Sequence, residues 1–191
     1  MLNQVLTSIG DLLNQHLVNK FHLEEKVVLL NFLVDQDGSV PQKNQNKIVL
    51  TLINLDLERN SPYYEGVHKF GTNKSSRTYQ NARFNLSLLA TASFDDYSES
   101  LKFLDAVIAF FQNNQTLDYT LLGVSSSFKS LTFDIANIGF QDTHNLWSAM
   151  GAKYLPSLIY LVRTIEISAD DIQEVRTNIS DIGVVSEVKN K

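Results

Sequence analysis

Residues 131–167 read LTFDIANIGFQDTHNLWSAMGAKYLPSLIYLVRTIEI. Apolar and polar side chains alternate over 131–138, which is typical of a strand with one buried face. Residues 157–167 carry apolar side chains on both faces, which predicts a strand in the middle of a sheet. Between the two strands, Asp142 or Thr143 can cap a short helix and Gly151 can end it. This stretch therefore predicts a strand, a short helix and a central strand.

Two longer helices are expected on either side of a run of strands. The first covers residues 2–20, where apolar residues recur at the three-and-four spacing of one helical face. The second covers roughly 96–113, with the pair Asp95–Asp96 as its cap. Its predicted buried stripe, widened by two further phenylalanines at 103 and 110, consists of Tyr97, Leu101, Leu104, Val107, Ile108 and Phe111.

The other strands are read from short apolar or alternating segments. Residues 26–34 (KVVLLNFLV) look like a buried strand. Residues 47–58 alternate, with a break near Asn54 that a bulge would explain, and 83–93 alternate again. Residues 117–123 fit a short strand or an irregular crossing. The fold class predicted is α/β (α+β): a mixed sheet of about five to six strands, with the N-terminal helix and the second long helix packed on it.

The domain organisation follows from the length of the chain and from its polar end. A chain of 191 residues is expected to form one domain, here 1–167. Residues 168–191 are a polar tail that is a possible interaction arm. Its first part has weak helical spacing at Ile172, Val175 and Ile179, and its end, GVVSEVKNK, fits either an added strand or disorder.

A long polar segment, residues 60–80, interrupts the predicted sheet. It contains two glycines and is longer than an ordinary hairpin loop. It carries Tyr63, Tyr64, Phe70 and Arg77, and aromatic residues and arginine are enriched at the energetic centres of protein interfaces. The segment is expected to be a loop that binds a partner or another subunit, or else a simple mobile loop.

The sequence gives no support to catalysis. The chain has no cysteine, and none of its four histidines has a second ligand at a metal-binding spacing. Adjacent carboxylates such as Asp170–Asp171 diverge and do not form an acid–base pair. No glycine-rich phosphate-binding motif is present. We expect no enzyme, no metal and no cofactor.

Charge and hydropathy argue against nucleic acid and against the membrane interior as partners. The net charge is −5 without a basic cluster, so nucleic acid is not an expected partner. No apolar run approaches the roughly 20 residues of a membrane-spanning helix, so direct membrane insertion is not expected. The N-terminus lacks the basic start of a signal peptide. Together with the absence of cysteine, this predicts a protein of a reducing compartment.

The stretch that opens this section also resembles a known family. Its helix carries Leu146, Trp147 and Ser148, followed by Tyr154, the pair Pro156–Ser157 and Tyr160. This arrangement resembles the end of the N-terminal domain of the cap, or tail-terminator, protein of phage-tail-like extracellular contractile injection systems. The resemblance extends over roughly residues 1–167: an N-terminal helix, a strand ending in NLDLERN, an aromatic-bearing loop, then NLSLLATA and a helix.

The resemblance implies a structural role. It suggests a tail-terminator-like fold and a homohexameric ring that ends polymerisation of the inner tube and the sheath and joins their distal ends. It implies no cofactor, and assembly in a bacterial cytoplasm as part of a particle that is later released or membrane-anchored. The residues expected at protein interfaces are Tyr63, Tyr64, Phe70, Arg77, Trp147 and Tyr154, although Trp147 also fits a core anchor of its helix.

Two other functions stay open at this point. The chain could be another structural subunit of the same particle, in the baseplate or a connector. Less in keeping with the sequence, it could be a small-ligand-binding module, which would need a deep polar pocket with converging titratable groups.

Overall fold

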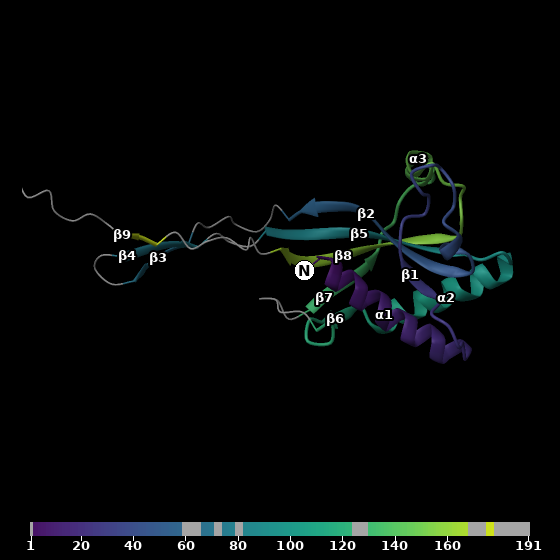
Figure 1. Cartoon of the computed structure of the whole chain (residues 1–191), viewed down its shortest axis with the longest axis horizontal. Coiled ribbons are helices and arrows are strands. Elements are labelled where there is room, and N and C mark those ends of the chain that lie inside the picture. Colours follow the sequence, from purple (N-terminus) through teal and green to yellow (C-terminus); the bar gives the residue numbers. More distant parts are fainter. Residues whose placement is uncertain are drawn as a thin grey trace, which may run out of the picture. The chain divides into compact units, whose positions relative to one another are not determined.

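A six-stranded mixed sheet organises most of the chain (Figure 1). The computed structural model describes residues 2–58, 66–70, 74–78, 82–123, 130–167 and 175–177. The strand order is β1-β2-β5-β8-β7-β6, in which β1 is parallel to β2, while β2–β5, β6–β7 and β7–β8 are antiparallel. The strands are β1 (Val28–Leu30), β2 (Lys47–Leu57), β5 (Ala82–Ser93), β6 (Thr116–Asp118), β7 (Ser130–Ile135) and β8 (Ser157–Ile167). The predicted mixed sheet is confirmed, and β8 lies centrally, as its two apolar faces indicate.

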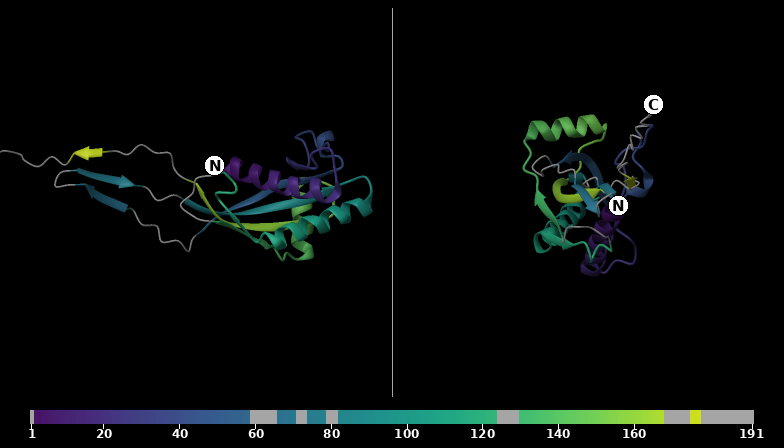
Figure 2. Two further views of the ribbon diagram at one scale, coloured as in Figure 1. Left: turned by 90° about the horizontal axis from the view of Figure 1, so that it is seen from below. Right: turned by 90° about the vertical axis from the view of Figure 1, so that its left-hand side faces the viewer.

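Helices cover both faces of this sheet. The long helices α1 (Leu2–Phe21) and α2 (Tyr97–Asn113) lie on one face and the shorter α3 (Phe140–Met150) on the other (Figures 1 and 2). A 3-10 turn, η1 (Gln42–Asn44), lies between β1 and β2. Two apolar cores result, a large one under α1 and α2 and a small one under α3.

The large core explains why α1 and α2 form where they do. The apolar face predicted for α1 is buried, with Ile9, Leu13 and Leu17 fully inaccessible. α2 contributes Phe103, whose ring stacks on Phe94 with centroids 4.4 Å apart. Aromatic pairs of this kind add to the stabilisation that burial alone provides.

The stripe predicted for α2 is right at Val107 and Phe111, which are buried, and wrong at Tyr97 and Leu101, which are 68% and 45% exposed. The buried residues of the helix are Ser100, Phe103, Ala106, Val107, Phe110 and Phe111. The two phenylalanines expected only to widen the face lie at its centre, because the facing core is aromatic: Phe21 lies 4.5 Å from Phe103, and Tyr160 lies 4.3 Å from Phe111.

The strand predicted over 26–34 is shorter than expected. Only Val28–Leu30 pairs with β2. The run is mainly apolar, with Lys26 and Asn31 as exceptions, because it passes from one core to the other: Val27 and Val28 belong to the large core and Leu33 to the small one. The apolar run therefore marks a crossing between two cores and not a long strand.

A separate, small antiparallel sheet consists of β3 (Gly66–Phe70), β4 (Lys74–Thr78) and β9 (Val175–Thr177). The chain divides into residues 1–58 with 83–167, and residues 59–82 with 168–191. The loop predicted over 60–80 thus contains two strands, and the weak helical spacing around Val175 is misleading. These short polar strands are joined by backbone pairing, which leaves little apolar alternation in the sequence. The predicted division into 1–167 and a tail arm stays a prediction.

Candidate protein-interaction surface around α3

The helix α3 is fixed at both ends by glycine. It begins after Gly139, in extended conformation, and not at a side-chain cap as predicted; the Thr143 hydroxyl donates to the Gly139 carbonyl at 3.1 Å within the first turn. Asp142 lies in that turn, where a negative charge favours the helix dipole. Gly151 ends the helix at φ 66°, as expected, with its N–H bonded to the Ser148 carbonyl at 3.1 Å.

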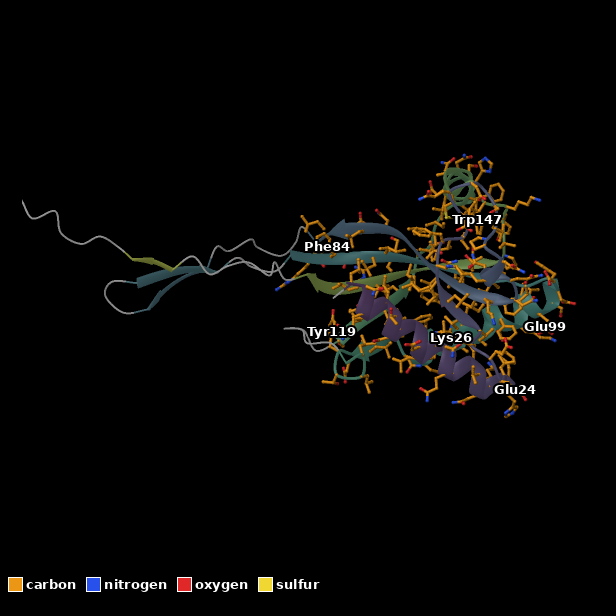
Figure 3. The ribbon with its side chains drawn as sticks, in the orientation of Figure 1. Glu24, Lys26, Phe84, Glu99, Tyr119 and Trp147 are labelled. Carbon is orange, nitrogen blue, oxygen red and sulfur yellow. The ribbon has the colours of Figure 1, made fainter. Side chains whose placement is uncertain are left out.

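Trp147 anchors α3 on the sheet. Its side chain points from the helix toward the strands and is only 5% exposed (Figure 3). It packs in the small core, whose other buried members are Leu33, Val49, Leu89 and Ile159. The small core therefore depends on one large side chain, which holds α3 in place.

The solvent side of this region is unusually apolar. Phe140, at the start of α3, is 90% exposed, and Tyr154, after its end, is 65% exposed. Ile135 and Ile138, in the segment leading into α3, are also exposed. We call these four residues the α3 surface. Exposed aromatic residues are typical of protein-interaction sites.

Two grooves flank Trp147. One, of about 420 Å³, is lined by residues that include Ile138, Leu146 and Tyr154. The other, of about 480 Å³, is lined by residues that include Leu33, Val40 and Leu155. The second groove is mainly apolar and suits apolar side chains of a partner, whereas the lining of the first is divided between polar and apolar surface.

A buried asparagine shapes the second groove. Asn44 is 1% exposed, donates from Nδ2 to the Phe32 carbonyl at 2.8 Å, and accepts from the Asn31 amide at 2.7 Å. These bonds fix the segment between β1 and β2, because a buried amide is costly unless it is paired. The groove wall is therefore built in advance of any binding.

The residues predicted for the interface fall into three groups. Tyr154 lies on the α3 surface, with its ring edge-on to Trp147 at 5.4 Å between centroids, whereas Trp147 itself is buried. Phe70 and Arg77 belong to β3 and β4, and Tyr63 and Tyr64 lie outside the described residues. The structure brings Trp147 and Tyr154 together, and their role at an interface stays a prediction.

Sequence reasoning missed Phe140. Phe140 lies seven positions before Trp147, a spacing that places both on about the same side of a helix and would bury Phe140 by pattern alone. Only the structure shows the ring in solvent. No other signal in a single sequence marks it.

The described residues offer little for chemistry. They contain no group of three or more histidine, cysteine, aspartate or glutamate side chains that could hold a metal ion. None of the helices they form is long and apolar enough to span a membrane. Burial raises the pKa of Tyr160 to about 12, and within the described part of the chain its hydroxyl has no hydrogen-bond partner. This tyrosine lies in the large core.

Comparison with known proteins points to one group. The sequence model described as the Pvc16 N-terminal domain matches residues 4–181. No curated protein sequence matches the chain. Two solved structures are similar, each at 14% identity: an extracellular contractile injection system PVC sheath/tube terminator in the extended state, with a TM-score of 0.59, and an anti-feeding prophage tube-terminating cap, with a TM-score of 0.57.

Each match covers nearly all of this chain but a smaller share of the solved chain. The first match covers 100% of this chain and 64% of the other, and the second covers 95% and 60%. The chain therefore spans less than two thirds of either solved chain. At this identity the likeness shows a shared fold, which agrees with the mixed sheet and helices described above.

Proposed function

The chain belongs to the Pvc16 N-terminal domain family, and from this membership we propose that it is the structural cap of a contractile injection system. In this role it ends the polymerisation of the inner tube and the sheath and joins their distal ends. The observation that carries the proposal is the likeness of the whole fold to two terminator structures, over 100% and 95% of the chain.

The proposed assembly is a ring of six copies, whose partners are the tube and sheath proteins. A growing polymer exposes the same binding surface at its end after every addition. A cap stops growth if it matches that end and offers no equivalent surface on its other side. A closed ring achieves this, because its subunit contacts return to the starting copy.

The α3 surface supports a role in docking. Tyr154 lines one of the two grooves beside Trp147, and Phe140, at the start of α3, is 90% exposed. Exposed aromatic rings are suited to packing against another protein. Such a role needs shape and apolar contact, without catalytic groups. We propose that the protein is not an enzyme and that it assembles in a bacterial cytoplasm.

The position of the chain in isolated particles tests the proposal. A chain carrying a gold-labelled tag should be found by electron microscopy at the end of the particle opposite the spike. Label at the spike end or along the particle would overturn the cap and favour a baseplate or connector subunit. Phe140→Ala should reduce labelling, while Asp105→Ala, an exposed change on α2, serves as the matched control.

A further inference from the structure

The N-terminal end of α3 presents an aromatic ring to solvent. Phe140, the first residue of the helix, is 90% exposed. Asp142 is presented at the same end, because a Cβ added to Gly139 would lie 3.6 Å from Asp142 Oδ2. His144 is exposed and follows Phe140 by four positions, which places it on the same side of the helix one turn further along. We call Phe140, Asp142 and His144 the α3 knob.

The second groove lies at the other end of α3. Its mainly apolar lining includes Leu33, Val40 and Leu155, together with Trp147 of α3 and Lys153, just beyond the helix. Its volume of about 480 Å³ exceeds that of one aromatic side chain. Filling such a groove with an apolar side chain removes apolar surface from water, which favours binding.

The knob and the groove of one copy do not fill each other. The 11 residues of α3 make a helix of about 16 Å at 1.5 Å per residue. Phe140, at one end, is exposed to solvent and so does not occupy the groove at the other end. Unlike surfaces at opposite ends of one helix favour a head-to-tail contact between copies, the heterologous type that closes a ring.

Phe140 is the exposed aromatic residue that suits this contact. The three others among the described residues, Phe32, Tyr97 and Tyr154, are 73%, 68% and 65% exposed. Each of them lies within two sequence positions of a residue that lines the second groove, so they belong to the receiving end. Phe140 alone among the four lies at the opposite end of α3.

The charged groups of the knob and of the groove are complementary. Lys153 is exposed and, within the described residues, forms no ion pair, so it can pair with Asp142 of another copy. Asp95 also lines the groove, and its Oδ2 accepts from two side-chain amides at 3.0 and 3.3 Å. Its other oxygen can accept an imidazole N–H from His144. The dipoles of two helices aligned head to tail add a further small attraction.

We propose that Phe140 of one copy inserts into the second groove of a neighbouring copy, beside Trp147. In this contact Asp142 lies beside the neighbour's Lys153, and His144 lies beside the neighbour's Asp95. The aromatic ring supplies the apolar anchor, and the polar groups at the rim set its orientation. The inference rests on the proposed ring and names the contact that closes it.

Chemical cross-linking between two copies tests this contact. The chain has no cysteine, so introduced cysteines react unambiguously. A chain with Asp142→Cys is combined with a chain of different mass that carries Lys153→Cys, and a short bismaleimide is added. The reaction is carried out on the purified chains and on particles assembled with both.

The expected product is a mixed dimer of the two chains. Asp105→Cys, another exposed aspartate on a helix, replaces Asp142→Cys in the matched control and should give none. A mixed dimer in neither the purified chains nor the particles, or a yield no higher than that of the control, would overturn the proposal.

Variants of the knob and of the groove show whether the ring inserts. Phe140→Ala, added to the Asp142→Cys chain, should lower the yield of mixed dimer at least about tenfold, because a buried aromatic anchor carries much of the binding energy. Val40 is 62% exposed and lines the groove, so Val40→Trp, added to the Lys153→Cys chain, should fill the groove and lower the yield similarly.

The control for the second variant is Leu101→Trp, an apolar position on α2 that is 45% exposed, and it should leave the yield unchanged. If Val40→Trp raises the yield or leaves it the same, apolar surfaces adhere without insertion, and the proposal is wrong.

These outcomes separate the inference from the proposed function. Cross-links between the chains, together with gold label away from the particle's end, would reject the cap and keep the contact. Label at the end opposite the spike, without cross-links in either sample, would keep the cap and reject the contact.

Discussion

Asp96 fixes where α2 begins. Its carboxylate accepts hydrogen bonds from the backbone N–H groups of Ser98 at 2.6 Å and Glu99 at 3.1 Å. Asp96→Ala leaves both donors without this partner, and the free energy of unfolding should fall by about 1 kcal/mol. Urea unfolding followed by circular dichroism measures the change. Asp105→Ala, an exposed carboxylate on the same helix, removes the same charge and should cost less; equal losses would show that capping is not the cause.

Alanine substitutions at Trp147 and Phe140 should have different effects, the first on the stability of the fold and the second on assembly. Trp147 is 5% exposed in the small core, and its replacement by alanine should lower the free energy of unfolding by about 3–5 kcal/mol. Phe140→Ala should change it by less than about 0.5 kcal/mol, because the ring is 90% exposed.

The same pair then distinguishes the two roles. Phe140→Ala should fold normally and yet bind the end of the particle less well, as measured by the fraction of particles that carry the chain. Undiminished binding by this variant would remove the α3 surface from the docking site.

Tyr160 makes the stability of the fold sensitive to high pH. Its pKa is raised by burial from 10.0 to about 12 in the folded chain, so the folded state holds a proton that the unfolded state loses first. The free energy of unfolding should therefore be unaffected below about pH 10 and fall as the pH rises from about 10 through 12. Tyr160→Phe should reduce this fall, and urea midpoints at several pH values would show it. An identical pH profile in both chains would contradict the assignment.

Within the helices and at their ends, alanine substitutions at two glycines should change the free energy of unfolding in opposite directions. Gly10 lies inside α1, and a Cβ added there meets only Leu50 Cδ1 at 3.8 Å, an ordinary contact. Gly10→Ala should raise the free energy of unfolding by roughly 0.5–1 kcal/mol. Gly151 ends α3 at φ 66°, so Gly151→Ala should lower it by about 1–2 kcal/mol. Urea unfolding of both variants checks the pair, and a shift of the same sign in each would refute the argument.

Elements with a strong, local hydrophobic pattern could be predicted from the sequence. α1 was predicted within one residue at its C-terminal end, and the break in β2 near Asn54 is the register shift seen in the structure. Gly151 was identified as the end of α3 because a left-handed position favours glycine. In each case the deciding interaction lies within the segment itself.

Elements whose form depends on distant residues could not be predicted. The rotation of α2 is decided by Phe21, Phe94 and Tyr160, which the helix's own periodicity does not reveal. The strands within 60–80 pair through the backbone with each other and with Val175–Thr177, about 100 residues away in sequence. A polar segment carries no sign of such a distant partner.

For the molecule as a whole, the family was predicted from a short motif and the surface was not. The resemblance carried by Trp147, Tyr154 and Pro156 agrees with the family match over residues 4–181. The exposure of the residues in the α3 surface depends on how distant segments pack, which no local pattern encodes. The sequence therefore predicted the family and the mixed sheet, whereas the exposed residues are known only from the structure.

The length of sheath and tube in particles assembled with and without the chain tests the central claim most directly. With the chain present, electron microscopy should show one narrow length distribution and joined ends. Without it, lengths should become variable, and the intact chain supplied separately should restore them, whereas Phe140→Ala should do so less well. Particles of normal, uniform length and normal contraction in the absence of the chain would contradict a role as the cap.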